Sequence, residues 1–229
     1  MKNLKFTALF LAAIMMLASC GTMNNTGKGA LIGGGGGAAL GAGIGALIGK
    51  GKGAAIGAAV GAAVGSGAGA LIGKKMDKQK AELEKIENAQ VSTVTDQNGL
   101  QAIKVTFDNG ILFKLNSSTL NAVSKTALSQ FLVALKNTPE TDITIWGHTD
   151  NTGTLAVNER ISAQRAEAVA DFLVQNGIPR SRMTTAGKAY HEPVASNDTE
   201  AGRAQNRRVD IYITANENMI KQAEQGTLQ

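Results

Sequence analysis

Two opposite charges, Asp150 and Arg165, lie in the part of the sequence best suited to binding chemistry. Asp150 belongs to a Gly-His-Thr-Asp-Asn-Thr-Gly run, which is dense in turn-forming residues and predicts a loop. A carboxylate accepts hydrogen bonds from an ammonium group, and a guanidinium donates two parallel bonds to a carboxylate. The pair therefore indicates a site for one zwitterionic ligand that carries both groups.

The elements predicted around these charges place them at the edges of regular structure. Residues 155–176 have apolar side chains at three- and four-residue steps, which predicts a helix. Arg165 shares a face of this helix with Ile161 and Val169, so it either reaches past the apolar stripe to water or points at a negative group. The run after Arg207 alternates like a strand. Element edges on a rigid scaffold often carry binding sites.

The rest of this region predicts a small α+β domain. Residues 91–95 and 102–107 alternate like strands around a turn cluster, residues 120–136 have a helical apolar face, and residues 142–146 alternate again. We expect a small mixed β-sheet packed under two main helices in the order βαβαββ, preceded by a glycine-zipper helical hairpin.

Further motifs occur in a characteristic order from about Ile103 to Thr214. They are Phe113-Lys114-Leu115-Asn116, the loop around Asp150, Asn158-Glu159-Arg160-x-Ser-x-x-Arg165-Ala, Arg182-Met183-x-Thr-x-Gly187 and Gly202-Arg203-Ala-x-Asn206-Arg207-Arg208-Val209. This half of the chain resembles the OmpA-like peptidoglycan-binding domain of bacterial cell envelopes. The resemblance implies that Asp150 and Arg165 clamp the diaminopimelate of a peptidoglycan stem peptide. It also implies that Asn116, Thr149, Asn158 and Arg207 line the site. Lys114 departs from the family, in which an Asp commonly follows the Phe.

Each of these residues also has a simpler interpretation. Asp150 can be a turn or helix-cap residue, Arg165 a solvated helix residue, and Arg207 a charge that guards a strand edge. His148 lies near Asp150 and can act as a general base, which keeps a cell-wall hydrolase as an alternative, or it can fix the loop as a structural donor. No nucleophile pattern accompanies it, and two histidines are few for a zinc hydrolase. We therefore predict a binding protein without enzyme activity, metal or cofactor.

The N-terminus predicts export and lipid attachment. Lys2 and Lys5 precede a short apolar run, which is typical of a signal peptide at residues 1–19 rather than of a membrane span. Leu17-Ala18-Ser19-Cys20 resembles a lipobox, in which the only cysteine of the chain becomes the lipidated first residue of a segment at residues 20–28. We expect an outer-membrane lipid anchor with the binding domain in the periplasm.

A glycine-rich segment follows at residues 29–75, where glycine recurs at every fourth position from Gly29 to Gly73. On a helix this step makes a flat stripe that allows another backbone to approach closely. Lysines divide the segment into two apolar stretches of about 21 residues, each long enough as a helix for the roughly 30 Å core of a membrane. We predict a membrane-associated or self-associating hairpin, with a flexible linker as the alternative.

Composition agrees with this organisation. The chain has 229 residues and a formal net charge of +5, and much of the positive excess lies in the leader and beside the glycine-rich segment. That distribution fits anionic lipid headgroups better than nucleic acid, and the low aromatic content of 4% argues against a base-stacking surface. We predict a linker or short solvated helix at residues 76–90, the binding domain at residues 91–217 and a tail at residues 218–229.

Overall fold

The computed structural model describes residues 67–96, 98–108, 113 and 117–229. Cys20, Asn116 and most of the predicted glycine-zipper hairpin lie outside these residues. Within the described residues, no helix is both long enough and apolar enough to cross a membrane.

A mixed five-stranded sheet forms the centre of the domain, in the order β1-β2-β5-β3-β4. The β1–β2, β2–β5 and β5–β3 pairs are antiparallel, whereas β3 and β4 are parallel. The strands are β1 (Ala89–Thr95), β2 (Gln101–Asp108), β3 (Thr141–Gly147), β4 (Met183–Gly187) and β5 (Arg208–Ala215). β5 is central, which explains why almost all of its side chains are buried.

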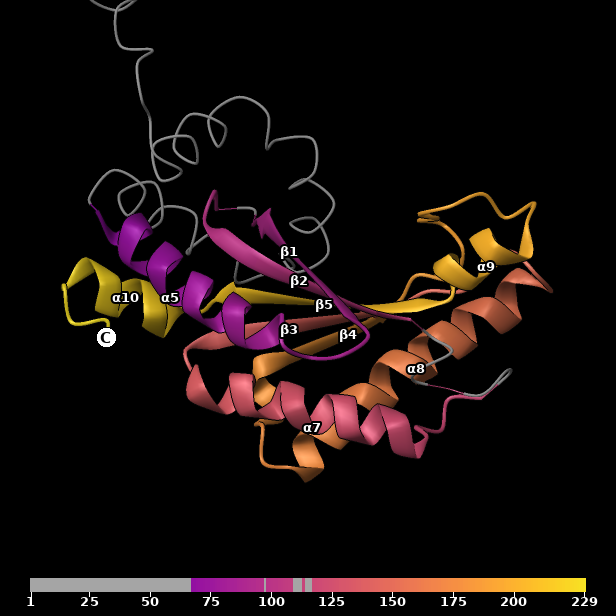
Figure 1. Cartoon of the computed structure of the whole chain (residues 1–229), viewed down its shortest axis with the longest axis horizontal. Coiled ribbons are helices and arrows are strands. Elements are labelled where there is room, and N and C mark those ends of the chain that lie inside the picture. Colours follow the sequence, from indigo (N-terminus) through magenta and orange to yellow (C-terminus); the bar gives the residue numbers. More distant parts are fainter. Residues whose placement is uncertain (1–66, 97, 109–112, 114–116) are drawn as a thin grey trace, which may run out of the picture. The chain divides into compact units, whose positions relative to one another are not determined.

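The longer helices cover one face of this sheet, and a short helix, α9, lies beyond the ends of the strands (Figure 1). They are α5 (Ala68–Leu83), α7 (Ala122–Asn137), α8 (Leu155–Gln175), the short α9 (Glu200–Asn206) and α10 (Glu217–Glu224), with a 3-10 turn at Arg180–Arg182. α7 begins at a capping box, in which Asn121 and Ser124 satisfy each other's backbone N–H groups. The predicted α+β class and the predicted βαβαββ core, here β2-α7-β3-α8-β4-β5, are confirmed.

The core lies between the helices and the sheet. The predicted apolar face of α7 and alternate residues of the strands contribute to it. Leu128, Phe131 and Leu135 of α7 are completely or almost completely buried. α8 matches the predicted apolar face only in part. Val169 and Leu173 are buried as predicted, but Val157 is 40% exposed. Ser162, Ala166 and Ala170 complete the buried face. Small residues at this face allow α8 to lie close to β3 and β4.

Two outer segments, predicted as a linker or short solvated helix and as a tail, are helices that pack against the folded domain. α5 runs through the predicted boundary at residue 75, and its Ala68, Ile72, Met76 and Leu83 join the core against β1, β2, α7 and α10. The predicted second membrane stretch therefore does not extend to Gly73 as an independent span. α10 likewise buries Met219, Ile220 and Ala223, where we predicted a tail. Packing of their apolar faces against the domain stabilises both helices.

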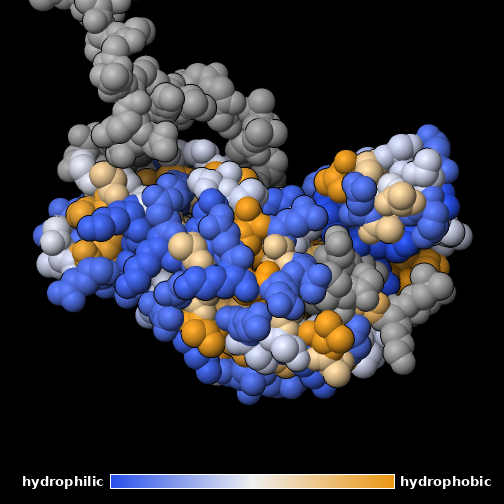
Figure 2. All heavy atoms as spheres, in the orientation of Figure 1, coloured by the Kyte–Doolittle hydropathy of each residue, from blue (hydrophilic) through white to orange (hydrophobic). Residues whose placement is uncertain are grey.

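The outer surface over the helices is that of a solvated domain. Figure 2 shows hydrophobic residues scattered in small groups among hydrophilic ones on the face viewed. Scattered apolar side chains are normal on a protein surface and identify no docking site. The opposite face of the sheet carries a second, smaller cluster of Trp146 and Tyr212, whose ring centroids lie 4.6 Å apart.

Candidate ligand-binding site

The loop that carries Asp150 leaves the end of β3 and is held by the neighbouring segments. The His148 N–H donates to the Arg208 carbonyl at 2.9 Å, and the Thr149 N–H donates to the Ala189 carbonyl at 2.8 Å. These bonds connect the loop to β5 on one side and to the segment after β4 on the other. The loop backbone is therefore fixed by the sheet, as a preorganised site requires.

Asp150 lies at this loop with both carboxylate oxygens engaged. Oδ1 accepts from the Thr152 N–H at 2.8 Å, and Oδ2 accepts from Arg207 Nη1 at 2.7 Å. Burial alone would raise the pKa of Asp150, but the hydrogen bonds from Arg207 and Thr152 outweigh it, so the pKa lies below its ordinary value. Asp150 is therefore ionised at neutral pH. Each carboxylate oxygen has two lone pairs, so the group keeps the capacity to accept from an ammonium.

Arg165 is buried in α8, with 3% of its surface exposed. The side chain therefore does not extend into water, which was one of its two predicted positions. Nε donates to the Ser117 carbonyl at 3.0 Å, and the guanidinium carbon lies 5.5 Å from the centre of the Phe113 ring. Burial and the nearby Arg207 lower the pKa of Arg165 to about 10, while Asp150 opposes the change. The charges of Arg207 and Asp150 therefore both act on the Arg165 guanidinium.

Asn158 and Thr149 complete the described part of the predicted set. Asn158 is buried, and its side-chain amide donates to the Thr152 carbonyl at 2.9 Å, which ties the first turn of α8 to the loop. Thr149 lies next to Asp150, but its hydroxyl is buried and makes no hydrogen bond to the described residues.

Two glycines set the distance between α8 and the loop. A Cβ at Gly147 would lie 2.0 Å from the Ser162 carbonyl oxygen, and one at Gly187 would lie 2.6 Å from the Ala163 nitrogen. Only glycine allows β3 and β4 to approach the helix backbone this closely. The Ser162 hydroxyl also accepts from the Ala189 N–H at 3.1 Å. This close packing is what brings the helix with Arg165 and the loop with Asp150 to one place.

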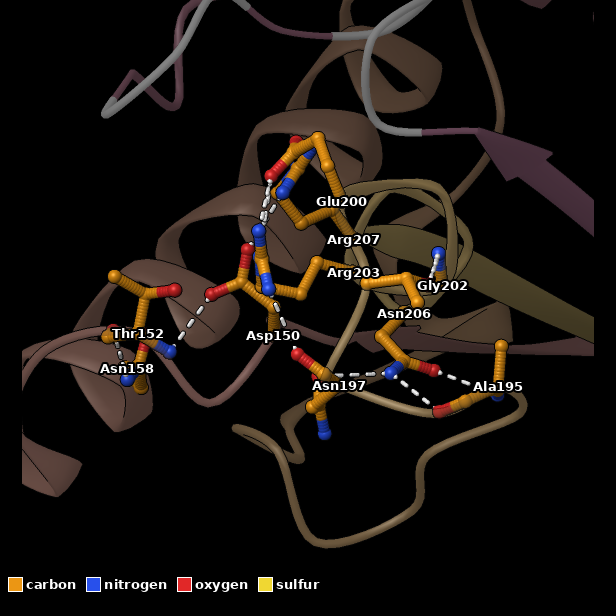
Figure 3. A network of polar contacts seen from close by, with 11 residues as sticks. Asp150, Thr152, Asn158, Ala195, Asn197, Glu200, Gly202, Arg203, Asn206 and Arg207 are labelled. Atoms are coloured by element: carbon orange, nitrogen blue, oxygen red, sulfur yellow. Dashed lines mark hydrogen bonds and ion pairs between the residues drawn. The ribbon is translucent and has the colours of Figure 1, made fainter.

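Arg207 connects the buried charge to the surface. Its Nη2 donates to Glu200 Oε1 at 2.8 Å, while Nη1 holds Asp150, so one guanidinium joins two carboxylates (Figure 3). Asn206, which is 0% exposed, holds the preceding loop: its oxygen accepts from the N–H groups of Val194 and Ala195, and its amide donates to Ala195 and Asn197. The Arg207 backbone is thus fixed beside the site.

His148 has a structural position rather than a catalytic one. It is 1% exposed, and its Nε2 lies 3.3 Å from the Asp210 carboxylate. Asp210 also accepts from Lys104 at 2.9 Å, from Arg208 at 3.1 Å and from the Thr106 hydroxyl at 2.7 Å. This buried network supports the base of the loop. Within the described residues, no three His, Cys, Asp or Glu side chains are placed to hold a metal ion.

We expect mild acid to destabilise the domain through His148. Burial lowers the pKa of His148, and the attraction of Asp210 offsets this only in part, against repulsion from Arg208. Because the unfolded chain binds the proton more strongly, with a pKa of about 6.5, stability is fully present above that pH and falls as the pH drops below it. Urea unfolding at pH 7.5 and pH 5.5 should differ by about 1 kcal/mol.

The other charged groups around His148 are Lys104 and Glu192, and the only other histidine is the exposed His191. A His191→Gln variant should keep the pH sensitivity, and a His148→Asn variant should lose it. Equal sensitivity in both variants would assign the effect to carboxylates instead.

Comparisons with known proteins agree with the predicted family and with the fold. Residues 112–207 match the OmpA family, and residues 1–77 match the YMGG-like Gly-zipper family. The chain carries an OmpA-like domain. It is 37% identical over 140 residues to the probable lipoprotein YiaD of Escherichia coli K12, covering 61% of this chain and 63% of the relative. It is 39% identical over 112 residues to the peptidoglycan-binding protein ArfA of Mycobacterium tuberculosis H37Rv, covering 49% of this chain and 34% of the relative.

Solved structures show the same fold. The cell wall anchor of the T6SS from Pseudomonas aeruginosa is 29% identical, with a TM-score of 0.52 over 61% of this chain and 96% of that one. A putative MotB-like protein from Desulfovibrio vulgaris is 23% identical, with a TM-score of 0.55 over 63% of this chain and 93% of that one. The chain spans less than two thirds of the length of the curated relatives. The match to the OmpA family at residues 112–207 agrees with the prediction of a binding domain.

The OmpA-like domain also contains site features that the sequence prediction missed. α9 and Glu200 were not predicted, because a seven-residue helix is too short for a periodic signal. A local signal was available, since Thr199 is a favoured cap residue, and Glu200, Arg203 and Arg207 follow at helical spacing. The role of Asp210 at the base of the loop had no comparable signal, because its partners come from three separate segments.

Proposed function

We propose that this protein binds peptidoglycan non-covalently by clamping the diaminopimelate of a stem peptide. Asp150 accepts hydrogen bonds from the ligand ammonium, and Arg165 donates to the adjacent carboxylate. Asn158, Thr149 and Arg207 support the site, and the family resemblance adds Asn116, which lies outside the described residues. The family supports peptidoglycan binding in general, because a relative with 39% identity is named a peptidoglycan-binding protein.

The observation that carries the proposal is that the Asp150 carboxylate and the Arg165 guanidinium are both buried and interact electrostatically. Asp150 and Arg165 are 7% and 3% exposed, and the pKa of Arg165 is raised by Asp150 while burial and Arg207 lower it. Burial and the neighbouring Arg207 both disfavour the charged form of the Arg165 guanidinium. A ligand carboxylate would stabilise that charge, and the ligand ammonium would stay beside Asp150.

The proposal extends to a tether. The lipid on Cys20 and the glycine-rich segment would hold the chain at the outer membrane, so that the OmpA-like domain reaches the cell wall from there. Relatives are named as a probable lipoprotein and as outer membrane proteins, which supports an envelope location. For the glycine-rich segment we propose membrane association or self-association, limited to the residues before α5.

One experiment tests both peptidoglycan binding and membrane anchoring. Fluorescent vesicles reconstituted with the full-length lipidated protein should sediment with purified sacculi and release no soluble wall fragments. A Cys20→Ala protein should itself sediment with sacculi but capture fewer vesicles than the parent. Undiminished vesicle capture by this variant would assign anchoring to the glycine-rich segment alone, and release of wall fragments would support a hydrolase.

A further inference from the structure

Glu200, the first residue of α9, lies between Arg203 of the same helix and Arg207, which follows the end of that helix (Figure 3). Its Oε1 accepts from Arg207 Nη2 at 2.8 Å, and its Oε2 accepts from Arg203 Nη2 at 2.9 Å and from Arg203 Nε at 3.1 Å. The Glu200 side chain is 69% exposed, whereas those of Arg203 and Arg207 are 27% and 22% exposed. A solvated carboxylate is thus bound by two largely covered guanidiniums.

The two arginines are held by contacts that do not involve Glu200. Arg207 Nη1 donates to the buried Asp150 at 2.7 Å, and Arg203 Nη1 donates to the Asn197 carbonyl at 2.9 Å. Asn197 in turn belongs to the loop that Asn206 fixes. Rotation of Glu200 into water would therefore leave both guanidiniums in place. An exposed ion pair contributes little to stability, so this rotation costs little.

Arg207 connects the Glu200 ion pairs to the proposed ligand site at Asp150. One guanidinium, that of Arg207, contacts Asp150 through Nη1 and Glu200 through Nη2. The Glu200 carboxylate thus lies one guanidinium away from the group that would hold the ligand ammonium. The hydrogen bonds from Arg207 and Arg203 lower the pKa of Glu200, so it is ionised and resembles a bound carboxylate ligand.

We propose that Arg203 and Arg207 form a second carboxylate subsite, which Glu200 occupies in the free protein and vacates for an acidic peptide. This subsite rests on the proposed function, because Asp150 must receive the ammonium of the same ligand. The matching ligand has an ammonium and a carboxylate at one end and a second free carboxylate on the neighbouring residue. Two guanidiniums discriminate a carboxylate from an amide, because an amide offers one acceptor and no charge. The subsite thus selects stem peptides whose glutamyl carboxylate is free rather than amidated.

The test compares two synthetic probes on the full-length protein in detergent by calorimetry. One is the tripeptide L-alanyl-γ-D-glutamyl-meso-diaminopimelate, and the other is the same peptide with the glutamyl carboxylate amidated. We expect Glu200→Gln to strengthen binding of the free-acid peptide by roughly two- to fivefold, since it removes a competing charge, and to change binding of the amide little. Arg203→Gln should weaken binding of the free acid and leave the amide unchanged.

Glu217→Gln is the matched control, because Glu217 is 68% exposed in an ion pair with Lys221 on α10. It should alter neither affinity. If Glu200→Gln weakens both peptides equally, Glu200 binds the ammonium and the subsite is wrong. Equal affinities for both peptides in every α9 variant, with binding still dependent on Asp150, would overturn the subsite alone. Binding that does not depend on Asp150, or no binding by the parent protein, would overturn the proposed function together with it.

Discussion

Replacing Asp150 or Arg165 with Ala is expected to abolish co-sedimentation of the full-length protein with sacculi. Both side chains are buried, and each has a partner that would lose its opposite charge: Arg207 for Asp150, and the ligand carboxylate for Arg165. Removing one member of a desolvated, hydrogen-bonded charge pair at a binding interface costs about 2 to 5 kcal/mol. Affinity should therefore fall by at least about 30-fold.

Conservative variants separate charge from shape. Asp150→Asn keeps the volume and the acceptor for the Thr152 N–H but removes the charge, so it should bind nearly as poorly as Asp150→Ala. Arg165→Lys keeps the charge but loses the planar pair of donors, and we expect an intermediate loss. Arg160→Ala, an exposed change on the same helix, is the control and should bind like the parent. Parent-like sedimentation of both Asp150→Ala and Arg165→Ala would refute the site, provided that circular dichroism shows them folded.

Replacing Gly147 with Ala is expected to damage both the fold and the site. The added methyl would lie 2.0 Å from the Ser162 carbonyl oxygen and 2.9 Å from its carbon, which are backbone atoms of α8. No side-chain rotation can relieve that contact, so β3 and α8 must separate. Overpacking of this kind costs about 1 to 3 kcal/mol and occasionally more, and we expect the upper part of that range. Because α8 carries Arg165 and β3 leads to Asp150, sacculus binding should fall as well.

Gly73→Ala provides the matched control in α5. Its added methyl would meet only the end of the Gln101 side chain, at 3.4 Å, and Ala favours a helix over Gly by up to about 1 kcal/mol. Urea unfolding should therefore show unchanged or raised stability for Gly73→Ala and a clear loss for Gly147→Ala. A Gly147→Ala protein with parent-like stability and binding would show that α8 does not depend on this close approach.

Sequence patterns located most of the domain because its elements have strong local signals. Leu128, Phe131 and Leu135 were expected on the core face of a helix and are buried in α7. The α8 face was less predictable, since the apolar Val157 faces solvent while the polar Ser162 and charged Arg165 are buried. Hydrophobic periodicity predicts that the most apolar side chains of a helix are buried. In α8 the close approach to β3 and β4 instead favours small side chains such as Ser162, and the proposed site places the charged Arg165 on the buried face. Local polarity therefore gave the wrong face at the N-terminal half of this helix.

The amino-acid sequence alone determined the α+β class, the OmpA-like family and the opposite charges of Asp150 and Arg165, because turn signals, strand alternation and motif order are properties of neighbouring residues. Only the tertiary structure decided that Arg207 bridges Asp150 to Glu200, that Asp210 supports His148, and that α5 and α10 belong to the core. These contacts join segments far apart in the chain. Their formation depends on sheet order and on how closely the helices approach the strands, and no local pattern encodes either.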